Sequence, residues 1–427
     1  MDASAFGGVG VSPARSARCP LPPAPTLMLP KSERVPAMSF KHLTSACLIL
    51  LLSVLMTQCT SSKSNAKSQG QPAPQPHDAG KAAVATDDAF AAALERAERS
   101  AESDGFSRAF KVEAKISLAG GDVNALSQFR VNPDGSFSVV DYERRKAGTY
   151  DRTGAYVRPI GGSGNQPGSQ VWPSDAVTAG EGTTAVADFQ GHRVNVFSND
   201  GKFRSSFIYT PQNFSAQRVL YDDTTRVFYL YGNRWQMGPN GQLDGASLLH
   251  KYSADGKFVA SYLPFPEEAK ALDLYSYNTA ALDMDKGEIF VSLPFDYKVY
   301  RLAPDGELST YLTGKDTAFK APTEGLEAKK RSPEEGYRYV QNWRLKWTPI
   351  TNLVVDKDKL LVQYQTFDPL RYTVDVWSRA TKKKLATFAT NHAILTRDHE
   401  GYIYFLENLE AKGQERYDII RAKLKVS

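Results

Sequence analysis

The fold of this chain is decided by residues 161–207, which read GGSGNQPGSQVWPSDAVTAGEGTTAVADFQGHRVNVFSNDGKFRSSF. A strand ends at Ala187-Asp188, a short loop follows, and His192-Arg193 opens the next strand. Short β-rich runs separated by turn residues predict a four-stranded antiparallel meander.

Two local signals support that prediction. The tripeptide 199–201, Asn-Asp-Gly, supplies a tight hairpin because Asp and Gly tolerate a positive φ. Val194, Asn195 and Val196 predict a half-buried strand, in which the two valines and the asparagine face opposite sides.

The same pattern recurs along the chain, and repeats of 40–50 residues indicate a propeller or a solenoid. Each unit has a hydrophobic strand, an acidic or glycine turn, an aromatic-rich strand, a loop and a third strand. The other units span residues 118–160, 208–262, 263–312, 350–388 and 391–424.

The 161–207 unit resembles an NHL repeat, through its glycine-rich opening, Pro173 and the sequence AVADFQGHRVNVF. The resemblance covers roughly residues 109–427. It implies an all-β fold, a six-bladed β-propeller of four-stranded antiparallel blades. The alternative architecture is a pair of β-sandwiches, which the even spacing of the repeats disfavours.

Ring closure is predicted from the two ends of the repeat region. The last unit ends after its third strand, and an extra strand, FKVEAKISL at 110–118, precedes the first unit. This N-terminal strand is expected to pair with the C-terminal blade as its outer strand, which removes exposed sheet edges.

Composition narrows the class of protein. The 427 residues include 21 Tyr and 21 Phe but only 6 Met, a bias that suits strands. The net charge of +5 is spread over the chain without a dense Lys/Arg block, so no nucleic-acid partner is expected. All three cysteines, Cys19, Cys47 and Cys59, precede the repeats, which excludes a disulfide or a cysteine metal site within them.

The N-terminus contains a targeting signal. Residues 43–56, LTSACLILLLSVLM, follow Lys41 and His42 and precede a polar stretch, as in a secretory signal peptide. The position of Cys59 resembles a bacterial lipoprotein signal, although Gln58 replaces the small residue expected before it. The alternative is an ordinary signal peptide that is cleaved a few residues later.

These signals divide the chain into four parts. Met38 opens a conventional signal, so residues 1–37 are interpreted as lying upstream of the natural start, and residues 38–59 as the signal peptide. Residues 60–108 are predicted to form a disordered tether and a short helix, the helix within 86–103. Residues 109–427 form the propeller. The protein is expected at the bacterial cell envelope, lipid-anchored through Cys59.

Candidate ligand-binding residues cluster in the loops that join the second and third strands of each blade. There, aromatic side chains neighbour polar or charged ones, a combination that suits sugars, cationic peptide groups or extended chains. The candidates are Asp141, Tyr142 and Arg144; Asp188, Phe189 and His192; Arg234 and Trp235; Phe295, Asp296 and Tyr297; and Phe367, Asp368 and Arg371. The structural alternative is that each Asp caps its own loop and that the aromatics pack between blades.

Two insertions lengthen the loops. Residues 314–347 begin charged and end aromatic, and residues 232–247 extend a loop of the third unit. We predict that the longer insertion forms a flap with Trp343, Arg344 and Trp347 at its base, and Trp343 is a further candidate ligand-binding residue. Surface decoration is the alternative.

No catalytic motif is found. His192, His250, His392 and His399 have no metal-binding spacing, and no nucleophile elbow or phosphate loop is present. The strand position of His250 predicts a surface or interface residue.

Two functions remain open. The first is a non-catalytic, monomeric binding propeller without a cofactor, whose partner is a protein, peptide or glycan. The second is a hydrolase or lyase with a metal in the central channel, for which Asp175, Asn278, Asn352 and His392 are the candidate ligands. Stoichiometric calcium or zinc in the purified protein would favour the second.

Overall fold

The computed structural model describes residues 105–180, 182–209, 214–232, 247–266, 280–314, 318–323, 343, 346–367, 370–407 and 417–425. The backbone alone is described for residues 367, 370 and 371. The predicted signal peptide, the tether and the helix within 86–103 lie outside the described residues.

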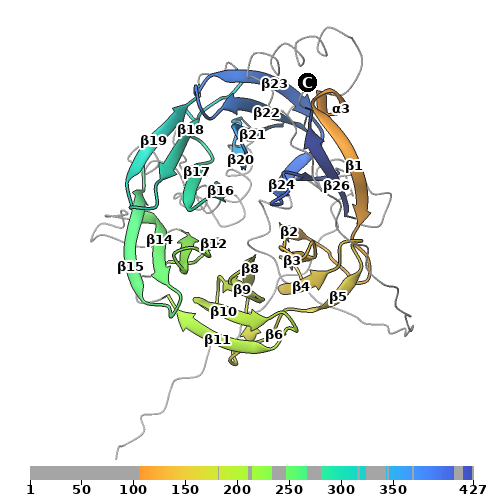
Figure 1. Cartoon of the computed structure of the whole chain (residues 1–427), viewed down its shortest axis with the longest axis vertical. Helices are drawn as coiled ribbons and strands as arrows, with labels where there is room; N and C mark the ends of the chain where they lie inside the picture. The colour runs from red at the N-terminus through yellow and green to blue at the C-terminus, as the bar shows by residue number, and fades with distance from the viewer. Residues whose placement is uncertain are drawn as a thin grey trace, which may run out of the picture. The chain divides into compact units, whose positions relative to one another are not determined.

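Six four-stranded antiparallel sheets surround a common axis and form a β-propeller (Figure 1). Blades 1 to 3 contain, in order, β2 (Leu126–Val131), β3 (Phe137–Asp141), β4 (Lys146–Tyr150) and β5 (Tyr156–Pro159); β8 (Pro173–Thr178), β9 (Thr183–Asp188), β10 (Arg193–Ser198) and β11 (Phe203–Ile208); β12 (Arg218–Asp222), β13 (Val227–Tyr231), β14 (Ser247–Ser253) and β15 (Phe258–Pro264). Blades 4 to 6 contain β16 (Ala281–Asp285), β17 (Glu288–Ser292), β18 (Lys298–Leu302) and β19 (Leu308–Thr313); β20 (Ile350–Asp356), β21 (Lys359–Phe367), β22 (Leu370–Ser378) and β23 (Lys384–Thr390); β24 (Ala393–Arg397), β25 (Ile403–Leu406), β26 (Asp418–Leu424) and β1 (Phe110–Ser117). A short parallel pair, β6 (Gly162–Ser163) and β7 (Ser169–Gln170), precedes blade 2, and the helix α3 (Gly105–Ala109) precedes β1.

The predicted ring closure is confirmed. Strand β1 pairs with β26 in antiparallel register, from Phe110 opposite Leu424 to Ser117 opposite Asp418. The N-terminal strand thus becomes the outer strand of blade 6 (Figure 1). The residue that precedes it, Ala109, is buried with Phe106 in the same hydrophobic cluster.

The core lies between the blades, and this corrects the alternation predicted for β10. Asn195 is fully buried and Val196 only partly so, although the pattern predicted a half-buried strand with a solvent-facing side. Both faces of a blade pack against neighbouring blades, so a middle strand has no solvent face. The side-chain nitrogen of Asn195 donates to the carbonyl of Ser169 (3.1 Å).

His250 is also buried rather than at the surface. Its side chain lies in β14 with no exposed area, and its ring centroid is 4.2 Å from that of Phe214 in the connection to blade 3. Its Nδ1 lies 2.9 Å from the hydroxyl of Ser261. The interface part of the prediction is therefore correct.

The predicted hairpin at 199–201 is present. Gly201 has a φ of +81° and donates its amide to the carbonyl of Ser198 (2.7 Å). A side chain at this position would be strained, which explains the glycine.

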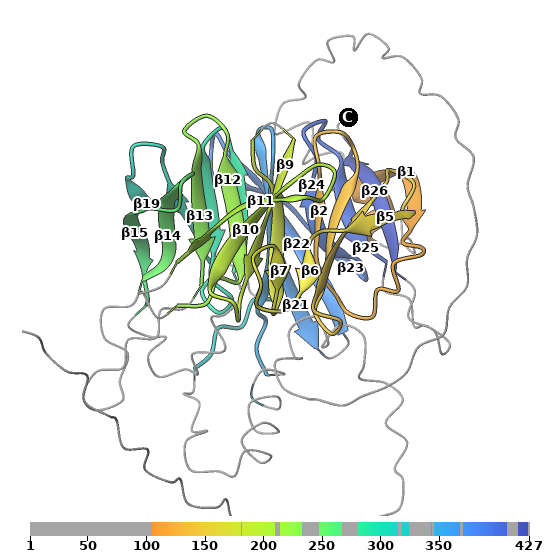
Figure 2. The same cartoon turned by 90° about the horizontal axis from the view of Figure 1, so that it is seen from below.

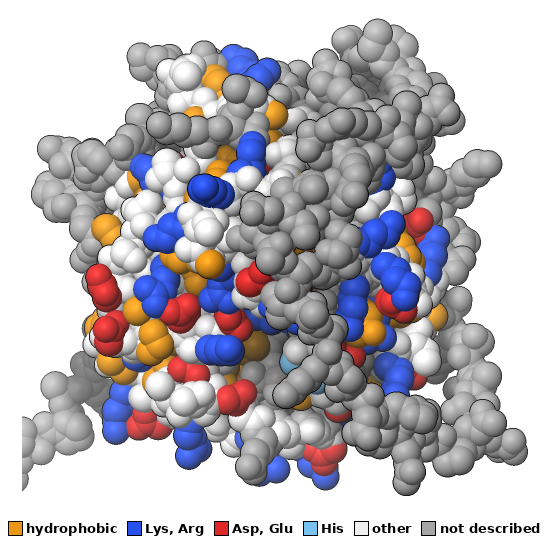
Figure 3. All heavy atoms as spheres, turned by 45° about the horizontal axis from the view of Figure 1, so that its top comes forward, with side chains coloured by type: hydrophobic (Ala, Val, Ile, Leu, Met, Phe, Trp, Pro, Cys, Tyr) orange, Lys and Arg blue, Asp and Glu red, His pale blue; other side chains and the backbone are white. Residues whose placement is uncertain are grey.

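Charges of both signs are interspersed on the surface. Figure 3 shows Lys and Arg beside Asp and Glu across the described part of one face, with no extended field of one sign. Among the described residues, no helix has the length and apolar character needed to cross a bilayer.

Candidate functional site

Two kinds of connection emerge on the same face of the propeller. Because neighbouring strands are antiparallel, the second and the fourth strand of each blade end on the same side of the propeller. The loops that join second to third strands and the connections between blades therefore share that side (Figure 2). We call this side the loop face. The hairpins between first and second strands, and between third and fourth strands, form the opposite hairpin face.

The carboxylates of the first two loops hold backbone amides. Asp141 accepts hydrogen bonds from the amide three residues later (3.0 Å) and from the amide of Asn124 (2.7 Å). Asp188 repeats both contacts, with the amide three residues later (3.0 Å) and with that of Trp172 (2.8 Å). Each carboxylate therefore ties its loop to the chain that enters the same blade, as the structural alternative predicted.

The two loops share their backbone geometry. The fourth residue after each aspartate, Arg145 and His192 respectively, has a positive φ, of 53° and 49°. Gly191 leaves room for the carboxylate, because a Cβ there would lie 2.1 Å from the Oδ2 of Asp188. The loops are thus rigid supports for the side chains between these positions.

Three rings and one arginine lie together at these loops. We call this group the aromatic cluster: Tyr142, Trp172, Phe189 and Arg145. The ring centroid of Trp172 lies 4.9 Å from that of Tyr142 and 6.3 Å from that of Phe189. The guanidinium of Arg145 lies 4.2 Å above the Trp172 ring, a cation–π contact. All four side chains are half-buried, and burial raises the pKa of Tyr142 well above its usual value. The cluster therefore offers fixed aromatic surface and a cation at the junction of blades 1 and 2.

Three other predicted residues are buried packing elements. The rings of Phe295 and Trp343 lie 5.4 Å apart, each almost without exposed area. The hydroxyl of Tyr297 donates to Asp375 and accepts from the indole Nε1 of Trp377 (3.2 Å). The Tyr297 contacts join blades 4 and 5, whereas Phe295 and Trp343 pack in the hydrophobic cluster between blades 3 and 4.

Predicted polar residues at the rim have local partners. Arg144 lies 3.3 Å from Asp122, and Asp296 lies 2.9 Å from Lys298. The Nδ1 of His192 is 3.2 Å from a backbone carbonyl in the connection to blade 3.

Part of the prediction falls on segments that the structure does not describe. Arg234, Trp235, Asp368 and the side chains of Phe367 and Arg371 lie outside the described residues. The same holds for Arg344 and for most of the predicted flap. The ring centroids of Trp343 and Trp347 lie 6.0 Å apart.

Near the axis, a carboxylate of blade 2 joins three blades. The buried Asp175 lies 3.0 Å from the guanidinium of Arg130 in blade 1. From blade 3 it accepts the amide of Val219 (3.0 Å) and pairs with Arg218 (3.3 Å).

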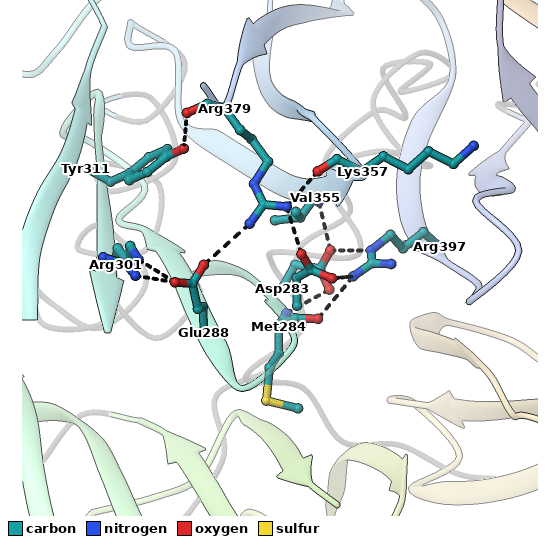
Figure 4. Close-up of polar contacts among 10 residues, drawn as sticks. Asp283, Met284, Glu288, Arg301, Tyr311, Val355, Lys357, Arg379 and Arg397 are labelled. Carbon is teal, nitrogen blue, oxygen red and sulfur yellow. Dashed lines mark hydrogen bonds and ion pairs between the residues drawn. The ribbon is translucent and has the colours of Figure 1, made fainter. Parts of the chain in front are cut away.

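A second carboxylate joins the other three blades (Figure 4). Asp283 of blade 4 accepts the amide of Val355 in blade 5 (2.8 Å) and the Nε of Arg397 in blade 6 (2.9 Å). Beside it, Arg379 of blade 5 binds Asp285 (2.7 Å).

Two arginines share one aspartate where blades 1 to 3 meet near the axis. Arg130 and Arg218 share Asp175, and burial together with the charge of Arg130 lowers the pKa of Arg218 to about 10. Asp175 is therefore the carboxylate that both of these largely buried cations contact directly.

The candidate metal ligands do not converge. Asp175 is occupied as described, and the amide of Asn352 donates to a backbone carbonyl of blade 6 (2.6 Å). The ring of His392 lies 4.4 Å from that of Phe106, and Asn278 lies outside the described residues. Within the described part of the chain, no three His, Cys, Asp or Glu side chains are grouped as a metal site.

Sequence reasoning missed two members of the aromatic cluster, Trp172 and Arg145. A signal for Trp172 was available, since it directly precedes Pro173 at a connection between blades, and such connections share the loop face. No local signal indicated that Arg145 would reach a ring of the next blade.

The fold and these contacts define the class: a closed six-bladed β-propeller with aspartate-capped loops on one face. The chain matches no protein-family model and no curated protein sequence.

Solved structures confirm the fold. A Bacteroides fragilis protein described as exported is 12% identical, with a TM-score of 0.54 over 74% of this chain and 96% of that one. A member of the DUF4221 family from Bacteroides vulgatus is 11% identical, with a TM-score of 0.54 over 74% and 98%. At these identities the likeness shows the fold alone.

Proposed function

We propose that this chain is an NHL-like propeller of the bacterial cell envelope that binds a protein, peptide or glycan through its loop face, without catalysis. The observation that carries this proposal is the aromatic cluster. Aromatic side chains and arginine are the residue types that contribute most at binding surfaces. Here they are fixed by two loops of the same geometry, so binding would cost little conformational entropy.

The sequence signals for export and anchoring support the proposed envelope location. The apolar run at 43–56 and Cys59 form a lipoprotein-like signal, and no cysteine occurs after residue 59. One structural neighbour is a protein described as exported. The chain enters the propeller through β1, the outer strand of blade 6 (Figure 1).

Replacing Cys59 with serine is expected to release the protein from the membrane fraction, because a lipidated cysteine is the proposed anchor. Detergent phase partition of cell fractions measures the change. A wild-type protein that is already water-soluble and begins several residues after Cys59, as shown by mass spectrometry, would exclude the lipid anchor.

Replacing Trp172 with alanine is expected to reduce capture of the partner at least about tenfold, because Tyr142, Phe189 and Arg145 all contact this ring or lie against it. The measurement is a quantitative pull-down from envelope extracts. Phe258 is the matched control: it is also aromatic and 45% exposed, but it lies on the outer strand β15. Equal loss from Phe258→Ala and Trp172→Ala would argue against the loop face.

A further inference from the structure

The interface between blades 1 and 2 changes character along its length. One part is apolar, and its buried residues are Val140, Ala147, Ile160, Ala176, Val186 and Phe197. Toward the hairpin face it becomes polar: Arg130, Ser138, Thr149 and Arg158 stand opposite one another across blade 1. Directly opposed residues share a face of the sheet, so the four form one row.

The row faces blade 2. At its inner end Arg130 binds Asp175 of that blade (3.0 Å). Nearby, Asn132 accepts a hydrogen bond from Thr178 of blade 2 (2.9 Å). Thr178 stands opposite Thr184, so blade 2 contributes hydroxyl groups to the same interface.

A cleft of about 240 Å³ opens where this polar part reaches the hairpin face. Its walls include Asn132, Thr149, Arg158, Thr178, Thr184 and Asn199, with Ile160 as an apolar element. The volume is below the roughly 300–1,000 Å³ of pockets that hold drug-sized ligands, so it suits one small molecule.

Several polar groups of the cleft have no partner among the described residues. The Nε of Arg158 is buried without a hydrogen bond, and among the described residues no carboxylate forms an ion pair with this guanidinium. The Arg158 side chain packs closely against Gly201, since a Cβ at Gly201 would lie 3.3 Å from the Cδ of Arg158. At the other end of the row Arg130 pairs with Asp175, whereas no carboxylate of the described residues pairs with Arg158. A half-buried arginine without an anion favours an anionic ligand.

The remaining groups narrow the ligand class. The hydroxyls of Thr149 and Thr184 and the amide of Asn199 can each donate and accept hydrogen bonds, which suits ligand hydroxyls. Among the described lining residues the one carboxylate is Asp134. It accepts a hydrogen bond from the amide of Ser136 (2.9 Å), and its second oxygen disfavours a doubly charged ligand. We infer that this cleft binds an acidic monosaccharide, with its carboxylate on Arg158 and its hydroxyls on Thr149, Thr184 and Asn199.

The test is calorimetric titration of the purified protein with glucuronate, glucose and inorganic phosphate as separate ligands. Glucuronate is expected to bind at least about tenfold more tightly than either glucose or phosphate, because only it satisfies both the cation and the hydroxyls. Arg158→Gln is expected to weaken glucuronate at least about tenfold. Arg152→Gln removes the same charge from an exposed turn position and should leave the affinity within about twofold.

Phosphate or glucose binding as tightly as glucuronate would overturn the ligand class. If glucuronate does not bind, or if Arg158→Gln binds it as tightly as the wild type, the proposal that this cleft is the binding site is wrong. If Arg158→Gln fails to fold, the shape-conserving Thr184→Val decides instead, with weaker binding expected and unchanged binding contradicting the inference. The cleft lies on the hairpin face, so these results are independent of those for the loop face.

Discussion

Replacing Phe110 with alanine is expected to lower the free energy of unfolding by about 3–5 kcal/mol. Phe110 is 2% exposed and lies in β1, the strand that closes the ring. Its ring centroid is 4.8 Å from that of Phe405 in blade 6 and 5.6 Å from that of Phe388 in blade 5. The truncation would therefore leave a cavity at the closure itself, and chemical denaturation would measure the loss.

The same strand supplies the control for this prediction. Val112 is 51% exposed, so Val112→Ala should cost less than about 1 kcal/mol. Similar losses from the two variants would show that β1 contributes backbone pairing rather than packing to the closure. A negligible loss from Phe110→Ala would contradict closure through this strand.

Replacing Asp175 with asparagine is expected to lower the free energy of unfolding by about 3–5 kcal/mol. The variant leaves Arg130 and Arg218 without their shared anion. Burial and the charge of Arg130, which already lower the pKa of Arg218, are then no longer offset by Asp175. The backbone amide of Val219 keeps an acceptor, since asparagine retains one oxygen. Denaturant unfolding at neutral pH measures the effect.

A double-mutant cycle separates the charge from the packing. The cost of Asp175→Asn should be smaller in an Arg218→Gln background, because one of the two unpaired cations is then absent. As a control, Asp200→Asn removes an exposed carboxylate that pairs with Lys202, and no measurable loss is expected. An equal cost of Asp175→Asn in both backgrounds would exclude the charge explanation.

Two of the candidate metal ligands make contacts that hold neighbouring blades together. Asp175 and Asn352 were candidate channel ligands because they lie on inner strands, and the position was correct. Their partners, however, are arginine, backbone amides and backbone carbonyls of neighbouring blades. Inner-strand polar residues mark either a site or a bridge between blades, and local sequence does not distinguish the two.

The sequence predicted some features of the loop face but not the orientation of its aromatic rings. The loops, their aspartate caps and the rings of Tyr142 and Phe189 were identified from the sequence. Phe295, Tyr297 and Trp343 were also identified, but they are buried between blades, as the structural alternative allowed. An aromatic residue in a loop carries no local sign of whether its ring faces solvent or a neighbouring blade.

The sequence alone determined the strand and turn pattern, the six-blade repeat and the closing strand, because these depend on periodicity and turn chemistry within short windows. Tertiary structure alone decided which polar side chains meet. Arg130 and Asp175 are 45 residues apart, and Asp283 and Arg397 are 114 apart. It also buried Asn195, since closing the ring covers both faces of every blade. Such contacts follow from the position of one blade against another, which no local pattern encodes.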